Sequence, residues 1–173
     1  CPMTPDPFAP ARLGPLELRN RIIKAATFEG VMPDGLVTDE LVEYHRRVAR
    51  GGVAMSTVAY LAVAPEGRTS AACIWLHDDA LPGLRRLTDA IHDEGAAAAA
   101  QMGHAGPVAD PRSNGAPSLA PSSSFSPVTM RRIRAVGDAD LVRIREAYVR
   151  GATRAVDAGF DALELHLGHN YLL

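Results

Sequence analysis

The chain has 173 residues, 47% of them hydrophobic and 22% charged, and a formal net charge of -2 at pH 7. This composition predicts one globular domain with a single buried core, and the weak negative charge excludes a nucleic-acid surface or an anionic membrane as its main partner. Two cysteines, Cys1 and Cys73, provide neither a disulfide framework nor metal-ligand spacing, and no run of about 18 apolar residues or signal-peptide pattern occurs, so we expect a cytoplasmic protein.

The first predicted elements lie before residue 28. The stretch LGPLELRNRIIKAAT (13–27) predicts a short hairpin arm. A first parallel strand is expected to follow it, from Arg21 to Ala26.

Three units follow, and each reads as an amphipathic helix, a glycine stop and a short apolar strand. The first helix occupies TDELVEYHRRVARGG (38–52), where Thr38 is the expected N-cap and the glycines end the helix. The strand VAMSTVAYLAV (53–63) is apolar almost throughout, as expected for a parallel strand covered on both faces. The helix face that we expect to pack is formed by Leu41, Tyr44 and Val48.

The second and third units repeat this pattern. A helix over 78–95 precedes AAAAAQM (96–102), which we assign as a strand despite its alanines because it follows the stop at Gly95. A helix over 137–159 precedes the strand FDALELHL (160–167). The expected packing faces are Leu84, Leu87 and Ile91 in the earlier helix and Leu141, Ile144 and Tyr148 in the later one.

The order of these elements predicts a parallel sheet of four strands joined by three helices, either doubly wound or closed as a barrel. The connections at 27–37 and 103–136 are long and follow strands, whereas the opposite connections are tight glycine turns; a (β/α) barrel builds its active site from such long loops. A dinucleotide fold would place G-x-G-x-x-G after its first strand, where this chain has AATFEG. We therefore predict an α/β fold of the barrel type.

The segment DALELHLGHNYLL (161–173) concentrates two histidines and a tyrosine at the end of the last strand. Alternation places Glu164 and His166 on the inner face and the leucines between them on the face beneath the helices. His166 then lies at the mouth of the sheet, with His169 and Tyr171 on the following loop. Two imidazoles there can act as paired hydrogen-bond donors, metal ligands or an acid/base couple, and the metal option is disfavoured because no third ligand stands nearby.

These residues carry a resemblance to a known family. AGFDALELHLGHNYLL resembles the segment of the Old Yellow Enzyme family, the FMN-dependent ene reductases, in which H-x-x-H or H-x-x-N is followed by x-Y-L. LRNRIIKAAT resembles the family's first strand, GGVAMSTVAYLAVAPEGR its second, QMGHAG its third, and NGAPSLAPS the loop after that. The resemblance covers nearly the whole chain and implies an FMN-binding (β/α)8 TIM barrel that passes hydride from NAD(P)H to an activated alkene.

The resemblance also implies roles for single residues in catalysis. His166 and His169 match the pair that hydrogen-bonds the carbonyl or nitro oxygen of the substrate. Tyr171 matches the residue that protonates the α-carbon from the opposite side. Gln101 matches the glutamine that contacts the pyrimidine ring of the flavin, and His166 is expected to contact the flavin as well.

Further FMN contacts are implied at the ends of the first two strands. Ala25, Ala26 and Thr27 match the end of the first strand, where backbone and a Thr or Cys side chain meet the flavin, so Thr27 is the expected tuning hydroxyl. Ala59 matches the flavin-facing turn of the second strand. The neighbouring Tyr60 departs from the small residue that the family usually has.

Two other features depart from the family pattern or add to it. His104 stands where the family begins H-x-G-R, but Pro107 replaces the arginine, so we expect a structural role for His104. The basic run MRRIRAV (130–136) is expected to be a solvated loop before a helix and not a phosphate grip on NADPH.

The family's barrel has eight strands, and this chain supplies four. We therefore expect residues 1–173 to form a single domain, the N-terminal half of the barrel, in a chain that is processed or starts inside a longer one, since it begins at Cys1. Expected partners are a small activated alkene and either the second half of the barrel or another copy of the chain, as a homo-oligomer. Two alternatives stay open: a half barrel that serves only as a structural or assembly module, and a related FMN barrel, such as a dienoyl-CoA reductase, with an iron-sulfur extension.

Overall fold

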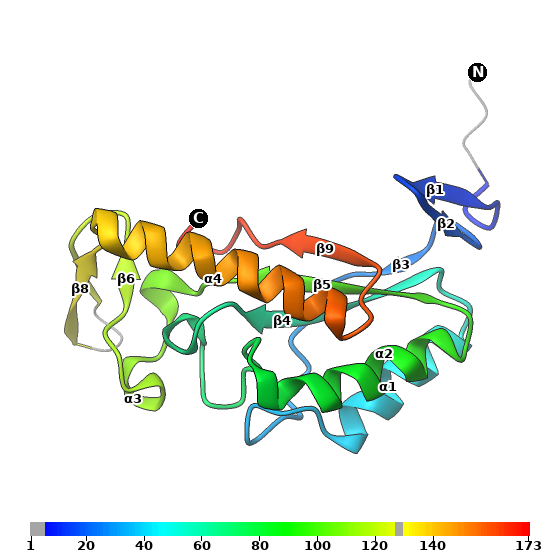
Figure 1. Ribbon diagram of the computed structural model, residues 1–173, viewed down its shortest axis with the longest axis horizontal. Coiled ribbons are helices and arrows are strands. Elements are labelled where there is room, and N and C mark those ends of the chain that lie inside the picture. Colours follow the sequence, from blue (N-terminus) through cyan, green and yellow to red (C-terminus); the bar gives the residue numbers. More distant parts are fainter. Residues whose placement is uncertain (1–5, 127–129) are drawn as a thin grey trace.

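The computed structural model describes residues 6–126 and 130–173, whose elements are labelled in Figure 1. The strands are β1 (Ala11–Leu13), β2 (Leu16–Leu18), β3 (Ile23–Lys24), β4 (Met55–Ala62), β5 (Ala97–Gly103), β6 (Leu119–Ala120), β7 (Ser124–Ser126), β8 (Arg131–Ala135) and β9 (Ala162–Leu165). The helices are α1 (Asp39–Arg50), α2 (Leu81–His92), α3 (Pro111–Asn114) and α4 (Asp138–Asp157), with short 3-10 helices η1 (Pro65–Gly67), η2 (Asp78–Ala80) and η3 (Gly106–Val108).

A four-stranded sheet of order β3-β4-β5-β9 forms the centre of the molecule, and every neighbouring pair in it is parallel. Helices α1, α2 and α4 connect these strands and pack against the sheet (Figure 1). Parallel neighbours need such crossovers, because the chain must return to the same end of the sheet before each new strand. The predicted sheet of four parallel strands with three connecting helices is confirmed.

The core lies between the sheet and the three helices. Leu84, Leu87 and Ile91 of α2 are fully buried, as their spacing predicts. They belong to the same apolar core as Ala98 and Ala100 of β5, which are also fully buried. Alanine favours helices in isolation, but here pairing with β4 and β9 satisfies the backbone, and the small side chains let helices approach closely. The predicted alanine strand is therefore confirmed.

Helix α1 packs through only part of the predicted face. Thr38 caps the helix as expected, since its hydroxyl accepts the Leu41 amide at 3.2 Å. The buried residues are Leu41, Val42, His45 and Ala49. Tyr44 is 37% exposed, so its predicted place in the core is wrong. His45 lies against the sheet, where its Nδ1 is 2.8 Å from the hydroxyl of Ser56, which reduces the cost of burying this polar ring.

The two outer strands of the sheet are shorter than predicted. β3 spans Ile23–Lys24 instead of residues 21–26, and β9 spans Ala162–Leu165 instead of residues 160–167. Each of them has one neighbouring strand among the described residues, so half of its backbone groups lack a ladder partner there. The long central strands β4 and β5, which are paired on both sides, match their predicted ranges closely.

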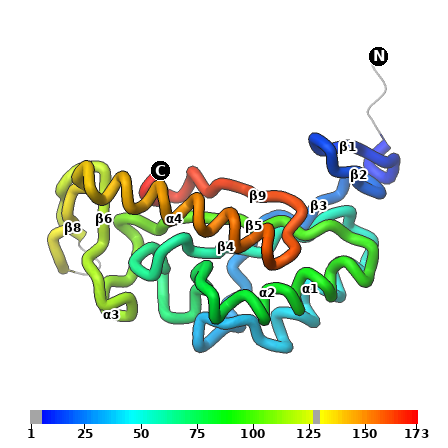
Figure 2. Tube along the Cα trace, viewed as in Figure 1, coloured from blue at the N-terminus to red at the C-terminus, as the bar shows by residue number. Residues whose placement is uncertain are grey.

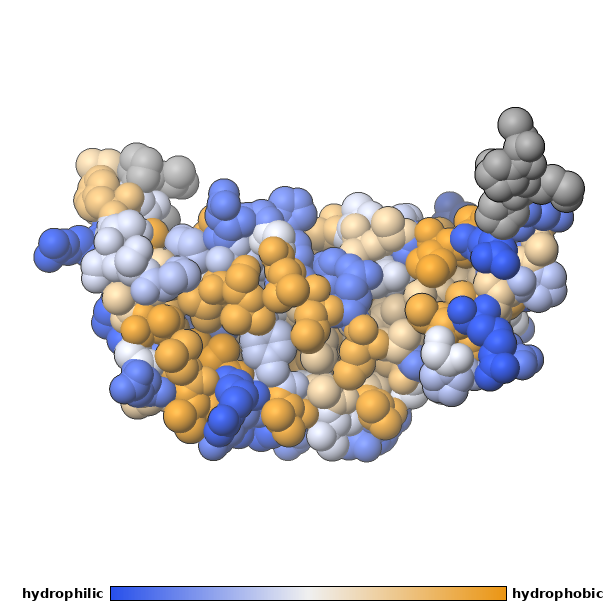
Figure 3. Space-filling view, turned by 90° about the horizontal axis from the view of Figure 1, so that it is seen from above, coloured by the Kyte–Doolittle hydropathy of each residue, from blue (hydrophilic) through white to orange (hydrophobic). Residues whose placement is uncertain are grey.

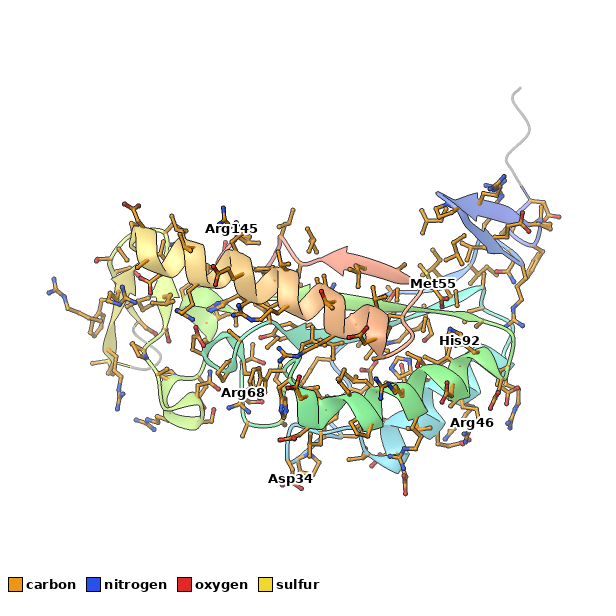
Figure 4. All side chains as sticks on the ribbon, viewed as in Figure 1. Asp34, Arg46, Met55, Arg68, His92 and Arg145 are labelled. Atoms are coloured by element: carbon orange, nitrogen blue, oxygen red, sulfur yellow. The ribbon has the colours of Figure 1, made fainter. Side chains whose placement is uncertain are left out.

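Two smaller β-structures lie at opposite ends of the sheet (Figure 2). The hairpin β1–β2, predicted as the N-terminal arm, lies where the sheet strands begin, the end at which Met55 and His92 are labelled in Figure 4. The sheet β6-β8-β7 lies at the other end, within the stretch 103–136 that was predicted as one long loop. That loop prediction is wrong, because β6 and β7 have only two and three residues, and the five residues of β8 are mostly arginines with no apolar alternation that would indicate a strand.

The basic run 130–136 belongs to this second sheet as strand β8, which corrects its assignment to a loop. β8 pairs antiparallel with β7, and its residues Arg131 and Arg132 are exposed, in agreement with a solvated segment. Arg134 binds Asp140 near the start of α4 through two contacts of 2.6 and 2.9 Å. Residues 127–129 of the same predicted loop lie outside the described residues.

Candidate active site

The inner face of the sheet, opposite the helices, carries polar side chains. Gln101 of β5 and Glu164 of β9 are register partners, and the amide of Gln101 donates to Oε1 of Glu164 at 2.6 Å. Leu163 and Leu165 line a groove beside α4 on the other face, so the predicted alternation of β9 is confirmed. Sequence reasoning placed Glu164 on the inner face but gave it no role, because its pairing with Gln101 depends on the strand register.

A β-bulge in β4 brings Tyr60 to the C-terminal end of the inner face. The register of β4 against β5 shifts between Val58 and Leu61, so Ala59 and Tyr60 together oppose a single residue. A bulge re-aims side chains in this way and is common beside active sites. Tyr60 is 4% exposed, its hydroxyl donates to the carbonyl of Gly67, and burial raises the pKa of its phenol. Tyr60, which stands where the family usually has a small residue, is therefore a buried aromatic ring held in one orientation beside the site.

His166 and His169 lie side by side at the end of β9. Nδ1 of His169 is 2.9 Å from Nε2 of His166, and their ring centroids are 4.9 Å apart. Burial, and then the charge of His169, lowers the pKa of His166, so this ring is neutral near pH 7 and can both donate and accept. No group of three or more His, Cys, Asp or Glu side chains in residues 6–126 and 130–173 is arranged to hold a metal ion.

Tyr171 completes a group of four rings, which we call the mouth cluster: Tyr60, His166, His169 and Tyr171. The ring of Tyr171 lies 4.5 Å from that of His166 and 5.5 Å from that of Tyr60. Burial, and then the nearby Cys73, raises the pKa of Tyr171, so its phenol keeps its proton at neutral pH. The structure thus brings together the two histidines and the tyrosine that the sequence placed at the mouth.

The residues predicted at the end of the first strand lie beyond β3. Ala26 packs with Ala59 in an apolar cluster that also includes Tyr171. Thr27 is exposed, its hydroxyl donates to the carbonyl of Ala25 at 3.3 Å, and it lines a hollow on the α1 side. Ala26 and Ala59 are therefore next to the mouth cluster, and the flavin roles of Ala25, Ala26, Thr27 and Ala59 stay predictions.

An apolar groove runs between α4 and β9 and is part of the apolar surface seen in Figure 3. Arg145 of α4, which is labelled in Figure 4, lies at this groove. The predicted α4 face lines it, but Leu141 is 52% exposed, so that face is only partly covered. The groove is lined by Met102, Pro121, Val136, Leu141, Ile144, Arg145, Tyr148, Val149, Ala152, Leu163, Leu165, Leu172 and Leu173.

Although α4 has 20 residues, neither it nor any other helix in the described ranges is long and apolar enough to cross a membrane.

Comparison with known proteins places this fold and site in a family. The chain matches the model of the NADH:flavin oxidoreductase / NADH oxidase family over residues 6–173. It is 59% identical over 170 residues to the 4,4'-dithiodibutanoate disulfide reductase of Rhodococcus erythropolis, with 98% of this chain and 42% of that protein covered. It is 37% identical over 166 residues to a metal reductase of Desulforamulus reducens, with 96% of this chain and 25% of that protein covered.

A solved structure shows the same architecture. The old yellow enzyme homologue from Zymomonas mobilis matches with a TM-score of 0.89 and 26% identity, over 97% of this chain and 50% of that one. The predicted (β/α)8 barrel fold is therefore confirmed, and the chain carries about the first half of it. The chain spans less than half the length of the two reductases that it matches.

Proposed function

Since this chain belongs to the NADH:flavin oxidoreductase / NADH oxidase family, to which Old Yellow Enzyme is related by fold and sequence, we propose that it forms part of an FMN-dependent reductase. Hydride would pass from NAD(P)H to the activated C=C bond of an α,β-unsaturated carbonyl or nitro compound. The observation that carries this proposal is the mouth cluster, in which the two imidazoles are 2.9 Å apart and the Tyr171 ring is 4.5 Å from that of His166.

The histidine pair would bind the oxygen of the substrate. His166 and His169 can each direct one N–H toward a carbonyl or nitro oxygen when the hydrogen bond between the two rings opens. Negative charge grows on that oxygen as hydride reaches the β-carbon. Two N–H donors directed at this oxygen would therefore stabilise the transition state more than the ground state, which is the condition for faster reaction.

Tyr171 would supply the proton that completes the reduction. Saturating the C=C bond adds one hydride to the β-carbon and one proton to the α-carbon. The raised pKa of Tyr171 keeps its phenol protonated, and its place beside His166 sets it next to the bound substrate. Solvent would then return a proton to the phenolate.

The inner face fits the ring of FMN in two respects. Ala26 and Ala59 contribute small side chains to the apolar cluster that also holds Tyr60 and Tyr171, and a flat ring would stack beside this cluster. The half-buried carboxamide of Gln101 gives one N–H to Glu164, so its second N–H and its carbonyl can pair with a pyrimidine edge. Bound FMN supplies the hydride; these residues would hold its ring, with Ala25, Thr27 and His166 as further proposed contacts.

Activity would require the rest of the barrel. The outer strands β3 and β9 each have one neighbour among the described residues, whereas a closed barrel of this type has eight strands. The remaining half, or another copy of this chain, would close the sheet and supply the phosphate site. The complete protein should be yellow and bleach with NAD(P)H under anaerobic conditions. A colourless complete protein would contradict the flavin proposal and favour a structural or assembly module.

A second substrate class is favoured by the relative at 59% identity, which is named a 4,4'-dithiodibutanoate disulfide reductase. Cleaving a disulfide also consumes one hydride and one proton: hydride converts one sulfur to a thiol, and the other sulfur leaves as a thiolate that is then protonated. The same site could thus serve both reactions. Rates of reoxidation of the reduced protein by cyclohexenone and by 4,4'-dithiodibutanoate would rank the two classes, and failure of both would reject the proposed activity.

A further inference from the structure

The turn that carries His169 and Tyr171 has an unusual backbone. His169 and Asn170 adopt φ values of 59° and 56°, in the left-handed region. Asparagine and histidine adopt this region more often than most residues do, but it remains unfavourable for any residue that has a Cβ. Such a turn persists only where neighbouring contacts hold it.

One contact that holds the turn comes from the segment after β5. The amide of Leu172 donates to the carbonyl of His104 at 3.1 Å, and Leu172 is 7% exposed. Gly106 of the same segment has a φ of +57°, and a Cβ at this position would lie 2.7 Å from the nitrogen of Leu172. The turn therefore packs directly on the backbone of residues 104–106.

The side chain of His104 fixes this segment from the inside. Its Nδ1 accepts the amide of Gly106 at 3.1 Å, which helps to hold the left-handed glycine in place. Because Nδ1 accepts, the neutral ring carries its hydrogen on Nε2. The ring is fully buried and lies so close to Gly67 that a Cβ there would be 3.0 Å from it. His104 is thus confined between η1 and its own loop.

Nε2 of His104 faces a buried carboxylate. It lies 4.0 Å from Oε1 of Glu66, whose side chain is 10% exposed. This separation is too long for a hydrogen bond. The same carboxylate oxygen has a closer contact with Arg143 of α4. The N–H dipole of the nearby His104 ring, and then the contact with Arg143, lowers the pKa of Glu66 to about 2, so the carboxylate is charged at neutral pH. α4 is in this way linked through Glu66 to the ring of His104.

We propose that His104 is a positioning residue that holds residues 104–106 against the His169–Leu172 turn, and so fixes Tyr171 and the histidine pair. Gly67 of η1 packs against its ring, and the carboxylate of Glu66, which is paired with Arg143 of α4, lies 4.0 Å from Nε2. The structural half of this inference stands on the contacts alone. Its catalytic half rests on the proposed function of Tyr171 as proton donor.

Three substitutions of His104 in the complete protein distinguish the role of Nδ1 from that of Nε2. His104→Asn keeps an acceptor close to the position of Nδ1, His104→Gln keeps a donor close to that of Nε2, and His104→Ala keeps neither. Amide hydrogen exchange at Leu172 reports the turn directly. We expect His104→Ala to speed this exchange about tenfold, the equivalent of one hydrogen bond, and His104→Asn to restore it to within about threefold of the original.

His45 offers a matched control, because it is an equally buried histidine of α1 that is bonded to Ser56 of β4 and makes none of the contacts that hold the turn. His45→Ala should lower the thermal midpoint while leaving the Leu172 exchange unchanged. If His104→Ala and His45→Ala have the same effect on that exchange, the positioning role is wrong. Where His104→Ala does not fold, the comparison of His104→Asn with His104→Gln decides: equal exchange at Leu172 in both would reject the role assigned to the Gly106 contact.

Activity gives a second readout. His104→Ala should slow reoxidation by an alkene about tenfold, because one lost hydrogen bond loosens the turn, and leave reduction by NAD(P)H unchanged. Faster exchange with unchanged alkene reduction would support the positioning role and contradict the proposed role of Tyr171. Unchanged exchange would overturn the positioning role, whatever the activity.

Discussion

Nδ1 of His169 lies 2.9 Å from Nε2 of His166, so one of these nitrogens carries a hydrogen and the other accepts it. The contact ties the orientation of each ring to that of the other, next to Tyr171. Groups that act as a pair lose most of their joint contribution when either one is removed.

Replacing either histidine by alanine should therefore cost almost as much as replacing both. We expect His166→Ala and His169→Ala each to weaken binding of 4-hydroxybenzaldehyde about tenfold, and the double variant to add less than about threefold. Titration of the flavin absorbance measures this binding. Reduction by NAD(P)H serves as the control and should be largely unchanged. Losses that simply multiply would show that the two rings act independently.

Tyr171→Phe should separate the two candidate reactions. Alkene reduction should fall about 100-fold, because the α-carbon needs a proton donor. Disulfide reduction should fall less than about threefold, because a thiolate of pKa about 8.5 leaves without being protonated. Anaerobic stopped-flow reoxidation by each substrate measures both. Tyr44→Phe, on the partly exposed face of α1, is the control and should change neither rate; equal losses for both substrates in Tyr171→Phe would argue against a proton donor.

Arg19 should stabilise the end of the barrel beneath the hairpin. Its guanidinium donates to the carbonyls of Ala49, Val53 and Glu94 at 2.7 to 3.1 Å, close to the C-terminal ends of α1 and α2. Arg19→Ala should lower the free energy of unfolding by about 1 to 2 kcal/mol, because carbonyls near two helix ends lose a charged donor. Urea unfolding measures the change. Arg12→Ala removes an exposed arginine of β1 and should change the free energy of unfolding by no more than about 0.5 kcal/mol. If both variants lose the same stability, the effect of Arg19 comes from the change in net charge and not from its hydrogen bonds.

Buried His45 should make the fold sensitive to mild acid. Burial, and then the charge of Lys24, lowers the pKa of His45 to about 3, below the ordinary value of 6.5. At a pH between these two pKa values, His45 binds a proton in the unfolded chain but not in the folded chain. The free energy of unfolding therefore decreases as the pH falls from 6.5 toward 3. One such group contributes a slope of at most about 1.4 kcal/mol per pH unit.

Urea unfolding of the original protein and of His45→Gln at pH 7.5, 6 and 5 tests this. The advantage of the histidine over glutamine should shrink at each step down in pH. A constant difference between the two proteins would show that His45 does not titrate in this range. The range above pH 5 lies above the ordinary pKa of Glu66, so that carboxylate does not enter the comparison.

Much of the architecture could be predicted from the sequence, because its long elements carry strong local signals. Leu84, Leu87 and Ile91 repeat at helical spacing and are buried together. Thr38 could be predicted as a helix N-cap because its hydroxyl can accept a hydrogen bond from an amide of the first helical turn, as it does from Leu41. The alternation of side chains along β9 correctly placed Glu164 on one face of the sheet and Leu163 and Leu165 on the other. The predictions failed where the local signal is weak: at Tyr44, at the ends of the outer strands β3 and β9, and at the short strands β6, β7 and β8.

The sequence by itself determined the order of strands and helices, and the gathering of His166, His169 and Tyr171 at one strand end, because periodicity and spacing are properties of neighbours along the chain. Only the tertiary structure decided that Gln101 bonds Glu164 and that a bulge turns Tyr60 toward the mouth. It also decided that His104 holds the turn at Leu172. These contacts join residues tens of positions apart, and their geometry depends on strand register and packing, which no local pattern encodes.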